Sequence, residues 1–91
     1  MDVNELSAKQ SKEKRELWQK DPRSLVRDLQ GIIGCLKKEM PEGTGYALLR
    51  AQALILATLV IFPDGLPRDK LIEEVSKLDS IVRLWEEVTP G

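Results

Sequence analysis

The pattern of apolar and polar positions divides the chain into four segments separated by proline and glycine. The first, from about Val3 to Lys20, is rich in helix-forming residues, and opposite charges four positions apart favour a helix there. It offers few apolar anchors before Leu17 and Trp18. We therefore expect residues 1–20 to form a polar N-terminal arm or helix that docks through Leu17 and Trp18 onto a helical core domain, residues 21–91.

The second segment has the clearest amphipathic pattern. Asp21 followed by Pro22 is typical of a helix start, with aspartate as the N-cap and proline in the first helical position. The apolar residues that follow fall within an arc of about 120° on a helix, which predicts one buried face. They are Leu25, Val26, Leu29, Ile32, Ile33, Leu36 and Met40. The helix is expected to end at Met40, because Pro41 disfavours helical geometry in the residue before it.

The third segment, Tyr46 to Phe62, is apolar on every side of a helical projection. A helix of this kind is typical of the centre of a bundle. Two buried strands are the alternative, but the length of the segment and its four alanines favour a helix. We therefore expect a central buried helix in which Ile55 and Leu56 are fully enclosed.

The fourth segment follows a turn at residues 63–67, and its apolar residues repeat in alternating steps of four and three, a heptad-like seam. The seam consists of Leu71, Val75, Leu78, Val82 and Trp85. Further apolar residues widen this face near the end of the chain. Together the four segments predict an all-α fold: a small three- to four-helix bundle with short connections and a central buried helix.

Composition limits the chemistry more than it limits the fold. The chain has no histidine and a single cysteine, Cys35, which excludes Ser/His/Asp triads, disulfides within one chain and most zinc sites. No histidine is present to activate Cys35, so we interpret it as a small, partly buried residue. We expect no enzyme activity, no cofactor, no metal and no small-molecule substrate.

The start of the chain and its longest uncharged run both indicate an intracellular protein. The acidic start of the chain lacks the apolar stretch of a signal peptide, and the longest run without a charge, 51–63, is shorter than the roughly 20 residues that span a bilayer. We therefore expect a cytoplasmic protein, or a nuclear one in a eukaryote, without membrane association. The formal net charge of −1 provides no overall attraction to nucleic acid, so any such binding requires a local patch.

One such patch is predicted on the back of the second helix, opposite its apolar arc. This basic stripe consists of Arg23, Arg27, Lys37 and Lys38. It is a plausible footprint for the phosphates of duplex RNA or DNA, extended by Lys12, Lys14 and Arg15 of the first segment. The alternative is an ordinary solvated face, because Asp28 and Glu39 flank the stripe and aromatic residues are not interleaved with it.

Gly31 and Gly34 lie inside the same helix, where each costs about 1 kcal/mol relative to alanine. With Cys35 they form a strip of small side chains that suits close approach of another helix. A kink, or simple tolerance in a marginal helix, is the alternative.

The four segments also contain more apolar surface than a single small chain can bury. The third needs cover on all sides, and the fourth is over-provided at its end; exposed apolar patches of this kind usually mark interfaces. The predicted interface consists of Ile81, Leu84, Trp85 and Val88 with Leu17 and Trp18. We therefore expect a small protein–protein interaction module (regulatory, adaptor or scaffold) that acts as a homodimer or as a subunit of a larger complex. The alternatives are that the first helix wraps the core more fully, or that the protein binds nucleic acid through the basic stripe.

Overall fold

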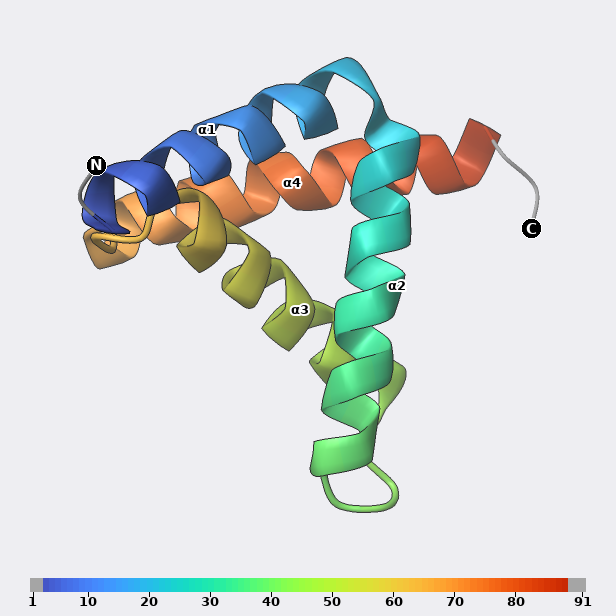
Figure 1. Cartoon of the computed structure of the whole chain (residues 1–91). Coiled ribbons are helices and arrows are strands. Elements are labelled where there is room, and N and C mark those ends of the chain that lie inside the picture. Colours follow the sequence, from blue (N-terminus) through green and yellow to red (C-terminus); the bar gives the residue numbers. More distant parts are fainter. Residues whose placement is uncertain (1–2, 89–91) are drawn as a thin grey trace.

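The computed structural model describes residues 3–88, and the side chains of residues 8–87. It contains four α-helices: α1 (Val3–Lys20), α2 (Pro22–Glu39), α3 (Tyr46–Ile61) and α4 (Arg68–Val88) (Figure 1). No strand occurs in the described residues. The all-α class and the small bundle of three to four helices expected from the apolar pattern are therefore confirmed, with four helices. None of the described helices combines the length and the apolar character needed to cross a membrane.

The connections follow from local sequence. A single residue, Asp21, joins α1 to α2, and its carboxylate accepts a hydrogen bond of 3.2 Å from the backbone N–H of Arg23 while Pro22 begins the helix. This produces the sharp corner between α1 and α2 (Figure 1). The turn between α3 and α4 includes Gly65 at φ +82°, a left-handed conformation that glycine adopts without steric cost.

Within this frame α2 and α3 are both central, because each packs against the other three helices. In Figure 1, α2 descends from the end of α1, the chain reverses, and α3 returns at an angle towards α1 and α4. The core lies where the four helices converge. It consists of Trp18, Leu25, Leu29, Ala53, Leu54, Ala57, Ile61, Leu78 and Val82.

The predicted full burial of α3 is wrong on one side of the helix. Leu56 is 39% exposed and Ile55 is only half-buried. The reason is geometric: the neighbouring helices lie over the half of α3 that contains Ala53 and Ala57, whose small side chains allow close approach. The opposite half is left without cover, although it is as apolar as the buried half.

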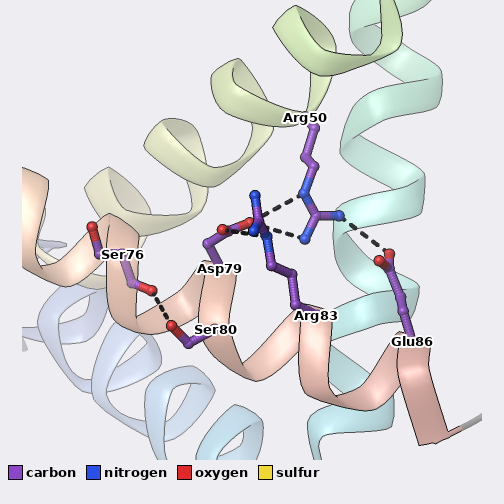
Figure 2. A network of polar contacts seen from close by, with 6 residues as sticks. All are labelled: Arg50, Ser76, Asp79, Ser80, Arg83 and Glu86. Atoms are coloured by element: carbon purple, nitrogen blue, oxygen red, sulfur yellow. Dashed lines mark hydrogen bonds and ion pairs between the residues drawn. The ribbon is translucent and has the colours of Figure 1, made fainter.

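A network of ion pairs fixes α3 against α4 (Figure 2). Arg50 donates from Nε and Nη2 to Asp79 Oδ1, at 3.1 and 2.9 Å, and from Nη1 to Glu86 Oε1, at 3.2 Å. Arg83 contacts the other oxygen of Asp79 at 2.9 Å. Burial lowers the pKa of Arg50, but the acceptors Asp79 and Glu86 outweigh it, and the net pKa lies above its usual value. Because Arg50 is the only charged residue of α3 and points to α4, the exposed half of α3 is neutral.

Candidate protein-interaction surface

One side of α3 exposes large hydrophobic side chains, among them Leu48, Leu56, Leu59 and Val60. Four of its residues, Leu48, Gln52, Ile55 and Leu59, recur in steps of four, three and four, the spacing of one side of a helix that packs against another helix. We call these four the α3 seam. Leu48 is 54% exposed, and Leu59 is also exposed. Gln52 and Ile55 are half-buried, and Leu59 lines a small pocket together with residues of α1.

An apolar cleft of about 580 Å³ opens beside the seam, between α1, α2 and α3. Most of its lining is apolar, and three of the lining residues are charged. The lining consists of Lys14, Trp18, Asp28, Gly31, Ile32, Cys35, Leu36, Glu39, Leu56, Ala57 and Val60. Leu56 and Val60 also border the seam along α3 and are both exposed, so the cleft and the seam adjoin.

The α1 wall of the cleft is held by polar contacts to α2. Both Trp18 Nε1 and Lys14 Nζ lie 2.8 Å from Asp28 Oδ2. Burial opposes ionisation of Asp28, but the hydrogen bonds from Lys14 and Trp18 and the charges of Lys14 and Arg27 outweigh it, so the pKa of Asp28 is below its usual value of 3.8. These groups satisfy one another and leave the apolar lining as the available contact surface.

The glycines of α2 remain open within the chain. A Cβ added at Gly31 or Gly34 would meet nothing within 4 Å, and α2 continues through both positions as one α-helix from Pro22 to Glu39. Gly31 lines the cleft together with Cys35, which is exposed rather than partly buried as expected. No packing inside the chain therefore compensates for the cost of these two glycines.

The chain exposes more surface than a compact monomer of its size. Its accessible surface is 6700 Å², whereas a monomer of 10.3 kDa is expected to expose about 5,400 Å². The radius of gyration of 13.7 Å likewise exceeds the value of about 12 Å expected for this length.

The residues predicted as one interface lie in different environments. Trp18 is 2% exposed and belongs to the core of its own chain, as expected for a residue that docks the first helix, and it also lines the cleft. Ile81 is half-buried against the core, and Trp85 is half-buried beneath the guanidinium of Arg23, 5.2 Å from the ring centre. Of this set, Leu17 and Leu84 are exposed. The side chain of Val88 lies outside the described residues.

The basic stripe keeps its predicted place on the solvent side of α2. Arg23, Arg27, Lys37 and Lys38 are all exposed, and none of them takes part in the ion pairs found among the described residues. The two lysines lie in the last turn of α2, where positive charge also interacts favourably with the helix dipole.

The predicted extension onto α1 is less available. Lys14 is paired with Asp28, and the guanidinium of Arg15 lies 5.0 Å from the centre of the Phe62 ring. Lys12 is exposed.

The α3 seam was not identified from the sequence, although a signal was present. Leu48, Ile55 and Leu59 share one side of the helical projection, and Gln52 is the polar residue that falls on this side. This signal does not decide which side is buried, because Thr58, which is also polar, is fully buried on the same helix.

Within residues 3–88, no three histidine, cysteine, aspartate or glutamate side chains are grouped so that they could hold a metal ion. The chain matches no family model, no curated protein and no solved structure. Its function is therefore inferred from its own surface.

Proposed function

We propose that this protein is a small protein–protein interaction module whose binding surface is the α3 seam and the adjoining cleft. The observation that supports it most directly is the row of exposed Leu48, half-buried Ile55 and exposed Leu59 on α3, a helix at the centre of the fold. Such a module acts as a regulatory, adaptor or scaffold protein, either as a homodimer or as a subunit of a larger complex.

The chemistry of this face favours protein over membrane as the partner. Helices that lie on membranes carry lysine and arginine beside their apolar face. The only charged residue of α3 is Arg50, and its guanidinium is bound to Asp79 and Glu86. An apolar face without free basic residues is instead typical of the core of a protein interface, which is depleted in charge.

Site-specific photo-crosslinking tests the proposal. A photo-reactive amino acid is placed at Leu48 or, as the matched control, at Leu84, which is 64% exposed on α4 and lies outside the α3 face. In cells that make the protein, we expect a discrete adduct from position 48 and none from position 84. The mass of the adduct separates a second copy, which adds 10.3 kDa, from a different protein. The absence of any adduct at position 48 contradicts the proposal.

Binding of duplex RNA or DNA through the basic stripe is the second candidate function. It is favoured by the exposure of Arg27, Lys37 and Lys38 and by the absence of ion-pair partners for them among the described residues. The open glycine Gly34 lies on the same side of α2, where it leaves room for close approach of a backbone.

Salt-dependent binding to a duplex tests this candidate. Replacing the four stripe residues with glutamine is expected to abolish binding and preserve folding. A matched control replaces Lys70 and Lys77, which pair with carboxylates of their own helix, and is expected to bind as before. The slope of log K against log salt is expected near −0.9 per neutralised phosphate on B-DNA. Phosphate contacts are strong at about 50 mM salt. If the unmodified protein does not bind the duplex there, the proposed nucleic-acid binding is contradicted.

A further inference from the structure

We infer that the cleft between α1, α2 and α3 receives an amphipathic helix of a different protein, with a basic residue of that helix beside Glu39. This inference rests on the proposed function, because it names the partner of the cleft that adjoins the α3 seam. It follows from the small side chains on one wall of the cleft, from the exposed apolar side chains on another, and from the charge of Glu39.

The α2 wall of the cleft has the length and the small side chains that suit close approach of a helix. It runs from Asp28 to Glu39, which is about 16 Å, or roughly three helical turns, at 1.5 Å per residue. Gly31 and Cys35 lie one turn apart on this wall, and both are exposed. A Cβ added at Gly31 would meet nothing within 4 Å, so the space beside it is open. The distance between two packed helices depends on the side chains at their contact, and small ones bring the helices closer.

The α3 wall supplies apolar contact with the same spacing. Leu56 and Val60 lie one turn apart, line the cleft and are both exposed. Rows of side chains four positions apart form the ridges and grooves through which helices pack against one another. The cleft, of about 580 Å³, therefore has two walls with the spacing of a helix–helix contact. An amphipathic helix in an apolar groove is a recurrent mode of peptide recognition.

The charge of the cleft is complementary to a basic residue. Of its three charged lining residues, Lys14 and Asp28 are paired at 2.8 Å. Glu39 is exposed and takes part in none of the ion pairs found among the described residues. It lies at the C-terminal end of α2, where the helix dipole also favours a cation, and the lysines of the basic stripe do not line the cleft. A lysine or arginine of the partner is therefore attracted to this end, whereas a phosphate group is repelled.

The described part of the chain does not itself contain a helix that fits the cleft. Such a helix presents a row of exposed apolar side chains together with a free cation. Among the described side chains, the large exposed hydrophobic residues outside α3 are Leu17 of α1 and, on different sides of α4, Ile72 and Leu84. The exposed row of α3 has no free cation, because its one charged residue, Arg50, is bound to α4. The features of the cleft therefore select a different protein over a second copy.

Selection from a displayed peptide library tests the inference on the full chain. The probe is a library of helical peptides, roughly four turns long, with leucines along one face and lysine or glutamate in all combinations at the polar positions. The unmodified protein is expected to enrich lysine over glutamate at least tenfold in one terminal turn. Glu39→Lys is expected to reverse this preference in the same turn, because it reverses the charge at that end of the cleft. The matched control, Glu87→Lys on the exposed side of α4, is expected to keep it.

Two glycine substitutions test the cleft without changing any charge. Gly31→Leu places a large side chain in the cleft, and Gly34→Leu places the same side chain on the same helix outside the cleft. An added Cβ meets nothing within 4 Å at either position, so both variants are expected to fold. Fluorescence anisotropy with a peptide selected by the unmodified protein is expected to give a Kd at least tenfold higher for Gly31→Leu and an unchanged Kd for Gly34→Leu.

The outcomes separate this inference from the proposed function. If the unmodified protein enriches no peptide, a helix is not the occupant. The absence of a lysine preference, or one that Glu39→Lys leaves unchanged, overturns the basic residue beside Glu39, and equal Kd values for the two glycine variants overturn the cleft as the site. Self-association that Gly31→Leu abolishes and Gly34→Leu preserves places a second copy in the cleft and overturns the different protein. If crosslinking from position 48 gives an adduct in any of these cases, the interaction module stands.

Discussion

Leu54 and Leu56 lie two positions apart on α3 and have opposite environments, with Leu54 4% exposed and Leu56 39% exposed. Leu54→Ala is therefore expected to destabilise the fold by about 2–5 kcal/mol, because it leaves a cavity in the core. Leu56→Ala is expected to cost less than about 1 kcal/mol, because much of its side chain is already in water. Urea unfolding at low micromolar concentration measures both. Equal losses would contradict the one-sided burial of α3.

The same substitution on two helices locates the interface. For a homodimer, Leu48→Glu is expected to abolish self-association, because it places a carboxylate in the α3 seam. Leu84→Glu is expected to leave the mass unchanged, although the sequence pattern placed the interface at this end of α4. Both leucines are more than half exposed, so helix content should be preserved in each variant. Light scattering gives the mass of each variant. If only Leu84→Glu dissociates, the interface lies on α4 and not on the α3 seam.

The open glycines predict a stabilising mutation. Gly34→Ala is expected to raise the free energy of unfolding by about 0.5–1 kcal/mol, because alanine favours the helix and its Cβ meets nothing within 4 Å. As a control, Gly65→Ala is expected to lower it by about 1 kcal/mol, because Gly65 has φ +82°. Chemical denaturation of both variants provides the comparison. A loss of stability in Gly34→Ala would show that the position is constrained within the chain.

The Arg50 network predicts unequal effects of two arginine replacements. Arg50→Met is expected to cost about 1–2 kcal/mol, because Asp79 then loses two hydrogen bonds from a mostly buried guanidinium. Arg83→Met is expected to cost less than about 0.5 kcal/mol, because Arg83 is largely exposed although it contacts the same carboxylate. Thermal unfolding followed by circular dichroism gives both values. A larger effect at Arg83 would contradict the role of Arg50 in fixing α3 to α4.

The ion pair of Asp28 predicts a dependence of stability on pH. The pKa of Asp28 is lower in the folded chain than its usual value of 3.8, so folding favours the carboxylate. Its contribution is complete well above pH 3.8 and is lost as pH falls through the folded pKa. Asp28→Asn is therefore expected to be less stable than the unmodified protein near pH 7, by about 0.5–1 kcal/mol for a partly exposed pair. The difference should disappear in strong acid, and a constant difference would exclude the ionised carboxylate as its source.

Local sequence was sufficient to predict the helices, because their limits depend on neighbouring residues. Asp21 and Pro22 begin α2, and Gly65 lies in the turn before α4. The covered side of α3 could not be predicted in this way. Both halves of α3 are apolar, and the choice depends on Ala53 and Ala57, which admit neighbouring helices closely.

The site was predicted less well than the fold, because its contacts join distant parts of the chain. Trp18 was expected both to dock the first helix onto the core and to belong to an interface. Its buried surroundings and its bond to Asp28 are set by the angle between α1 and α2. The pairing of Arg50 with Asp79 and Glu86, which directs the one charge of α3 towards α4, spans 29 and 36 positions. No local pattern indicates either contact.

The two tryptophans report separately on two helix junctions. Trp18 of α1 is buried and donates to Asp28 of α2, whereas Trp85 of α4 is half-buried beneath Arg23, at the start of the same helix. Indole emission shifts to longer wavelength on contact with water. Trp85→Phe therefore leaves a fluorophore that senses detachment of α1, and Trp18→Phe leaves one that senses detachment of α4. Rapid-mixing measurements on the two variants then order the docking of α1 and α4 onto α2 in time, without any added label.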